Sequence, residues 1–137
     1  MKMKYVTLSL HKLYFIVGSI SIFLGIETIA RMYNWYQLFP KYDLLSHFLF
    51  GLSWYGIYFL WKQKDKQKLS KKGFFDRAFL SYIGVALFWE FLEKIGDTIL
   101  FNTDYLMDIF FWDGFYDVVV GLIGLLFAYY ILESRIK

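Results

Sequence analysis

Six ionisable side chains stand near the ends of long apolar stretches in this chain. They form three pairs at helical spacing, namely Asp43 with His47, Glu90 with Glu93, and Asp113 with Asp117. Residues three or four positions apart project from one face of a helix, so each pair presents two polar groups in one direction. Carboxylates and an imidazole are ligands for a hard or borderline divalent cation. The spacing therefore predicts a metal site for Mg, Mn or Zn with all six residues as ligands.

A metal in such a site would activate water for attack on a lipid headgroup or a lipid-linked phosphate. Water is the expected nucleophile, because the chain has no cysteine and no serine in a context that marks it as activated. We assign His47, Asp43 and Glu90 as candidate catalytic residues. His47 and Asp43 are interpreted as metal ligands or as the general base, and a metal-dependent hydrolase is the enzyme that this pattern favours.

Each pair also has a simpler interpretation. Asp43 stands where a helix N-cap is expected, and an N-cap favours Asp. Asp113 and Asp117 fall in the first turns of a helix, where the helix dipole stabilises anions. Glu90 and Glu93 are harder to explain in this way, since they approach a helix C-terminus and repel each other. A bound cation or shared protons would relieve that repulsion.

The composition points to an integral membrane protein. Of the 137 residues, 58% are hydrophobic and 24% are aromatic, which is more apolar surface than a soluble domain of this size can bury. Apolar length predicts an all-α fold, a four-helix transmembrane bundle that forms a single domain over residues 1–137. The predicted spans are about 13–30, 44–61, 74–95 and 109–132.

The positive charges predict the orientation of these spans. Twelve Lys and Arg side chains fall at the two termini and in the connection between the second and third spans, whereas the other side has only Arg31, Lys41 and Lys94. Basic loops stay in the cytoplasm, so we expect both termini to be cytoplasmic and the protein to lie in the cell membrane. The six site residues then fall near the outer face, in a pocket between the second, third and fourth spans.

Smaller features give further expectations about packing. Glu27 and Arg31 are four residues apart and should form an interfacial ion pair. Glycines on the site-bearing helices, such as Gly121 and Gly124, would let a neighbouring helix approach closely. A stripe of small residues in the first span is expected to serve helix packing, and it consists of Gly18, Ser21, Gly25 and Thr28.

Other functional classes stay open at this stage. The chain lacks a phosphate-binding glycine loop, an HExxH pair and a nucleophile elbow. Acids inside a helix bundle also suit a cation or proton transporter, and a buried polar cluster can act only as structural glue in a non-catalytic membrane module. Membrane lipid is the expected partner, homo-oligomerisation is left open, and nucleic acid is not expected, since topology explains the net charge of +3.

Three ordered motifs resemble the YjdF-type family of small, uncharacterised bacterial inner-membrane proteins. They are Tyr42-Asp43-x3-His47-Phe48-x2-Gly51, Trp89-Glu90-x2-Glu93 and Trp112-Asp113-x3-Asp117-x3-Gly121. The resemblance runs from about Tyr42 to the C-terminus, and the chain departs from the family in its shorter front part and in the connection before Trp112. The resemblance implies a shared site at the same six residues and no named activity.

Overall fold

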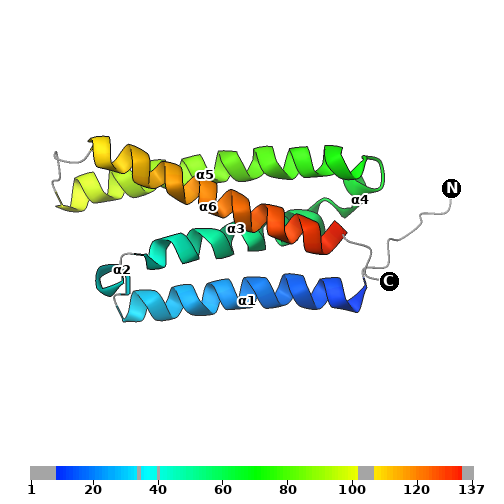
Figure 1. Ribbon diagram of the computed structural model, residues 1–137, viewed down its shortest axis with the longest axis horizontal. Helices are drawn as coiled ribbons and strands as arrows, with labels where there is room; N and C mark the ends of the chain where they lie inside the picture. Colours follow the sequence, from blue (N-terminus) through cyan, green and yellow to red (C-terminus); the bar gives the residue numbers. More distant parts are fainter. Residues whose placement is uncertain (1–8, 34, 40, 102–106, 134–137) are drawn as a thin grey trace.

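The structure is a computed structural model that describes residues 9–33, 35–39, 41–101 and 107–133. Within these helices the side chains at 36–37, 93–94, 96–101, 107–111 and 113 are not described. The described chain is helical, and its elements are α1 (Leu10–Met32), α2 (Trp35–Leu38), α3 (Tyr42–Trp61), α4 (Gln63–Lys66), α5 (Lys71–Phe101) and α6 (Met107–Glu133). The long helices α1, α3 and α5 run roughly parallel, and α6 slants across them (Figure 1). The predicted all-α class is confirmed.

Three of the described helices are long and apolar enough to cross a membrane, judged by length and composition. They are α1, α3 and the Gly114–Glu133 part of α6, and the protein is therefore a membrane helical protein. α5 covers the third predicted span and is longer than expected, because the helix continues past Gly96 to Phe101. Glycine weakens a helix interior but does not by itself end it.

Helix α3 is the centre of the bundle and packs most extensively against α6, then against α1. Glycines make the α3–α6 crossing close: a Cβ atom at Gly51 would run into the backbone of Gly121, and one at Gly124 would run into the carbonyl of Phe48. This confirms the close approach predicted from the glycines. α6 crosses the other helices obliquely (Figure 1), and α5 packs against both α6 and α3.

The small-residue stripe of α1 does not pack against the other described helices, so that prediction is wrong. A Cβ atom at Gly18 or Gly25 would meet no other atom within 4 Å. α1 instead contacts α3 through Ile16, which is fully buried and lies against Gly56. The small residues therefore face outward, because Ile16 and other larger side chains on the opposite face, such as Phe23 against Phe50, make the contact with α3.

At the end of the bundle away from Asp43, lysines bind the C-terminus of α6. Lys66 forms an ion pair with Glu133, which also accepts a hydrogen bond from the Tyr55 hydroxyl at 3.3 Å. The Lys71 ammonium donates to the Glu133 carbonyl at 2.9 Å. Cations stabilise the unpaired carbonyls at a helix C-terminus, so these contacts fix the end of α6 to α4 and α5.

Candidate metal site and the adjoining cavity

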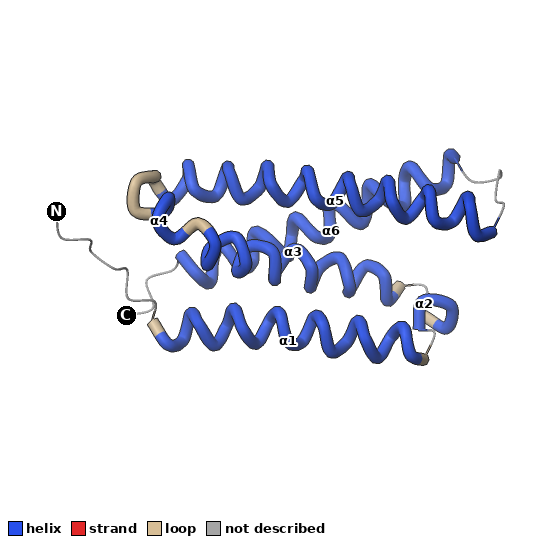
Figure 2. Tube along the Cα trace, turned by 180° about the vertical axis from the view of Figure 1, so that it is seen from behind, coloured by secondary structure: helices blue, strands red, loops and turns tan. Residues whose placement is uncertain are grey.

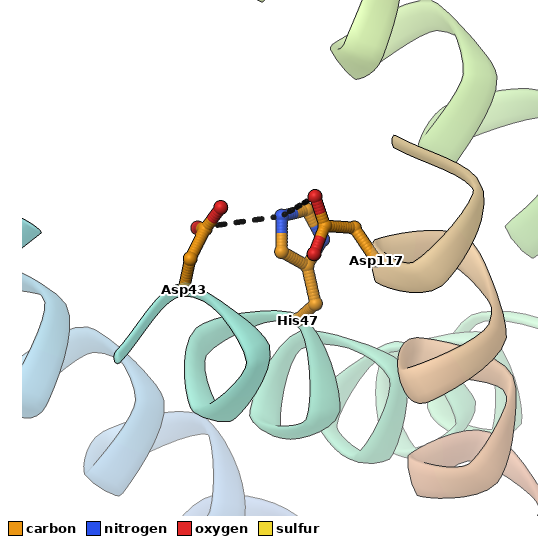
Figure 3. Close-up of side chains that lie close together, drawn as sticks. All are labelled: Asp43, His47 and Asp117. Atoms are coloured by element: carbon orange, nitrogen blue, oxygen red, sulfur yellow. Dashed lines mark ion pairs between the residues drawn. The ribbon is translucent and has the colours of Figure 1, made fainter. Parts of the chain in front are cut away.

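Four of the six predicted site residues come together around one imidazole nitrogen. His47 Nε2 lies 3.6 Å from Asp43 Oδ1, 3.9 Å from Glu90 Oε1 and 3.8 Å from Asp117 Oδ2. Asp43 and His47 are one turn apart on α3, while Glu90 comes from α5 and Asp117 from α6. Figure 3 shows the imidazole between the carboxylates of Asp43 and Asp117. Three helices therefore build one polar centre, as the sequence predicted.

The centre is largely shielded from its surroundings. The side chain of Asp117 is 6% exposed, that of His47 is 11% and that of Glu90 is 13%, whereas Asp43 is 31% exposed at the rim. Carboxylates at this spacing and depth cannot all stay ionised without compensation, since like charges in a medium of low dielectric disfavour the charged form. A bound cation would therefore stabilise the ionised carboxylates at this place.

Asp43, His47 and Asp117 together offer a donor set for a metal ion. Each contributes one ligand atom, and these atoms all lie within 4.8 Å of one another. Ligands of a tetrahedral zinc ion are about 3–4 Å apart, given bonds of about 2.0–2.2 Å, so closure by about 1 Å would complete the contacts. Two carboxylates and an imidazole suit Zn or Mn, and the residues present fit such an ion.

Asp43 reaches this centre from the first turn of α3 and is not the helix cap. The N-cap is Lys41, which makes no side-chain capping hydrogen bond, and the helix begins at Tyr42. The predicted N-cap role of Asp43 is therefore wrong. Its carboxylate instead turns along the helix toward His47, one turn further on.

The side chains of Glu93 and Asp113 lie outside the described residues, so their place as ligands stays a prediction. Two neighbouring groups were missed in the sequence. Gly114 makes room for Glu90, because a Cβ atom there would lie 2.7 Å from Glu90 Oε2. Tyr82 is fully buried, and its hydroxyl donates to the Val118 carbonyl at 3.5 Å. The glycines predicted to lie on one face of α6 were the signal in the sequence that could have indicated these close contacts.

A cavity of about 390 Å³ adjoins the centre on the side of α3 that faces α1 and α5. Its lining residues are Phe23, Glu27, Arg31, Asp43, Ser46, His47, Phe50, Val85, Phe88 and Trp89. The sequence predicted a pocket between the second, third and fourth spans, and the observed cavity lies between the first, second and third. The glycine contact of α3 with α6 explains the difference, since it leaves no open space between those two helices.

Glu27 and Arg31 form the predicted ion pair at 2.8 Å. Glu27 also accepts a hydrogen bond from the Ser46 hydroxyl at 2.9 Å, which connects α1 to α3 next to His47. The four-residue spacing predicted only a simple interfacial contact, and the pair also lines the cavity. The signal that could have indicated this role was the acidic residue Glu27 near the end of an apolar helix.

A sequence-family model described as "Predicted membrane protein (DUF2238)" matches residues 4–137. The match includes every residue of the polar centre and of the cavity. No curated protein and no solved structure matches the chain.

Proposed function

The chain belongs to the DUF2238 family of predicted membrane proteins, whose description names no activity, and we propose a function from the geometry of its site. The protein is a divalent-metal-dependent membrane enzyme that hydrolyses a lipid headgroup or a lipid-linked phosphate. The more specific resemblance to YjdF-type proteins stays a prediction from the sequence.

The observation that carries this proposal is the convergence of ligand atoms from two helices. Asp43, His47 and Asp117 hold the metal, with Glu90 beside them at 3.9 Å from the same imidazole nitrogen. When bound, a divalent ion supplies Lewis acidity toward a phosphoryl oxygen and activates water. Carboxylates gathered in a shielded place favour cation binding, because a cation stabilises their charged form.

The chain's own residues divide between the cavity and the interior. Asp43 and His47 line the cavity and are exposed to a molecule that occupies it. Glu90 and Asp117 lie behind them and do not line it. We assign Asp43 as the group nearest the substrate, able to accept a proton from attacking water, and Asp117 as a ligand that stays in place.

We also propose that the protein has four spans in a single transmembrane domain, with both termini cytoplasmic. α5 has 31 residues, a length of about 46 Å at 1.5 Å per residue, which exceeds the hydrocarbon thickness of about 30 Å. The distribution of Lys and Arg supports the orientation. The metal centre then lies in the outer half of the cell membrane.

Metal content of the purified protein, measured by elemental mass spectrometry, tests the proposal. Wild type should carry close to one Mn or Zn per chain after loading, and His47→Ala and the Glu90→Gln/Asp117→Asn double variant should lose it. Asp76→Asn is the matched control, because this carboxylate is half exposed at the other end of the bundle. Folded wild type that takes up no metal after loading would overturn the proposal.

A structural role is the second candidate, and the glycine crossing of α3 and α6 favours it. That crossing brings Asp117 against His47 without help from a ligand. Protonated acids can hydrogen-bond across helices and so fix the packing. In that case Asp117→Asn would keep both fold and stability, and no metal would be found.

A further inference from the structure

The cavity beside the metal centre has one polar end and one apolar end. Asp43, Ser46 and His47 of α3 meet Glu27 and Arg31 of α1 at the polar end. The rest of the lining is aromatic or aliphatic and consists of Phe23, Phe50, Val85, Phe88 and Trp89. Phe23, Phe50 and Val85 form the apolar end, because each lies about a turn or more further from the polar residues along its helix. A binding site with this division fits an amphiphile whose polar head and apolar tail are contiguous.

The length and position of the cavity match one leaflet of a bilayer. Arg31 and Phe23 stand at its two ends on α1, about 12 Å apart at 1.5 Å per residue. Half of the hydrocarbon core of a bilayer is about 15 Å thick. The cavity lies over α3 between α1 and α5, and Figure 2 shows α3 between these two helices.

We infer that this cavity binds one acyl chain of a phospholipid and places its phosphate at the Arg31 end, beside Asp43 and His47. The part of the inference that makes this lipid a substrate rests on the proposed function. The cavity volume of about 390 Å³ is within the usual range for ligand sites, about 300–1,000 Å³. A single chain with its head therefore fits better than a whole two-chain lipid, whose second chain stays in the bilayer.

Arg31 gives the polar end its affinity for phosphate. Its side chain is 61% exposed and lines the cavity together with Ser46, while its guanidinium pairs with Glu27 at 2.8 Å. Arginine is suited to phosphate because its planar donors match the oxygen geometry. Glu27 and Asp43 oppose an anion at this end, so the phosphate site depends on Arg31 together with the cation at the metal centre.

Photolabelling in vesicles tests the site. The protein is reconstituted into phosphatidylethanolamine and phosphatidylglycerol vesicles that contain phosphatidylglycerol with a diazirine on one acyl chain, and labelled residues are mapped by mass spectrometry. Label should concentrate at Phe23, Phe50 and Val85. Positions on α6 that are half exposed, such as Leu126 and Phe127, report the background from surrounding lipid.

Two tryptophan variants on α5 separate the cavity from the lipid-facing surface. Val85→Trp fills the cavity and should lower its labelling about tenfold, a change of about 1.4 kcal/mol. Leu87→Trp is the matched control, since Leu87 is 57% exposed and does not line the cavity. The inference would be overturned if the label were spread uniformly over all lipid-facing helices. It would also be overturned if Val85→Trp had the unfolding temperature of wild type and its cavity were labelled as strongly.

A second probe tests the phosphate and is independent of whether Val85→Trp folds. Arg31→Gln should weaken labelling by the phosphatidylglycerol probe. It should leave labelling unchanged for a diacylglycerol probe that has the same diazirine chain and no phosphate. Arg31→Lys should weaken phosphatidylglycerol labelling less than Arg31→Gln does. Equal loss for both probes would overturn the phosphate assignment. Metal content is measured on the same samples. Cavity labelling without metal would overturn the enzyme proposal and the part of the cation in phosphate binding, and it would leave the acyl-chain site standing.

Discussion

His47 on α3 and Asp117 on α6 face each other across the tightest helix crossing in the described part of the bundle. Nε2 of His47 lies 3.8 Å from Oδ2 of Asp117, beyond the range of about 2.7–3.2 Å for a direct N–H···O hydrogen bond. The backbones are held by glycine contacts rather than by this pair. The two side chains therefore point at a shared space, as ligands of one ion do.

Metal binding should raise the free energy of unfolding of the protein, and Asp117→Asn should lose this stabilisation. In wild type, a free metal concentration of about 100 times Kd adds about 2.7 kcal/mol to the free energy of unfolding. Without metal, Asp117→Asn replaces a buried acid by a neutral amide of the same shape and should not lower the unfolding temperature. With Mn or Zn, the unfolding temperature of Asp117→Asn should not rise and should therefore be lower than that of wild type.

The measurement is thermal unfolding in detergent, with chelator and with each metal. Asp76→Asn should follow wild type in both conditions, because its exposed carboxylate is far from His47. Asp117→Asn that gains as much stability from metal as wild type does would contradict the assignment of Asp117 as a ligand.

Much of this arrangement could be predicted from the sequence because membrane helices obey simple rules of length and spacing. The helical repeat placed Asp43 with His47 on one face, and the need to neutralise intramembrane charge indicated that Glu90 and Asp117 would meet them. Gly121 indicated the close crossing. These inferences depend on local geometry and on charge, which a single sequence contains.

The cavity could not be predicted, because its position depends on which helix faces stay apart. The contact of Ile16 with Gly56 turns the small-residue stripe of α1 outward. The same packing brings Glu27 to Ser46 and opens space between α1 and α5. Rotation of α1 about its axis is set by such contacts, and its weak amphipathic pattern does not specify it.

The glycine crossing should tolerate no side chain. Gly124→Ala would place a Cβ atom against the Phe48 carbonyl, and Gly51→Ala would place one against the backbone of Gly121. Each should lower the free energy of unfolding by about 1–3 kcal/mol, the cost of overpacking. Gly25→Ala, which meets open space, should be neutral or stabilise by up to about 1 kcal/mol through helix propensity.

Chemical unfolding of the three glycine variants in mixed micelles measures these differences. Gly25→Ala controls for the backbone effect of replacing glycine in a helix. Equal effects at Gly25 and Gly124 would show that the α3–α6 contact is looser than the structure has it.

Ser46→Ala should loosen α1 from α3. The Ser46 hydroxyl is buried and donates to Glu27 Oε2 at 2.9 Å, and hydrogen bonds to charged groups contribute about 1.5–3 kcal/mol. Thr28→Ala is the control, since its exposed hydroxyl donates only to the Leu24 carbonyl within α1. Unfolding free energies of the two variants test this, and a loss at Ser46 no larger than at Thr28 would contradict it.

Lys66 should make the stability of the protein rise with pH in the alkaline range. Burial lowers the pKa of Lys66, and the attraction of Glu133 opposes that shift. Between this lowered pKa and the ordinary value of 10.5, the unfolded chain binds more protons than the folded one. The free energy of unfolding therefore increases with pH in that window.

The difference between wild type and Lys66→Met isolates this effect from the titration of other groups. When unfolding free energies are measured from neutral pH to pH 10.5, the stability of wild type relative to Lys66→Met should increase as pH rises. Glu133→Gln removes the opposing attraction, so the gain should begin at a lower pH in that background. If wild type instead loses stability relative to Lys66→Met as pH rises, the ion pair with Glu133 outweighs burial, and the direction of the pKa shift is wrong.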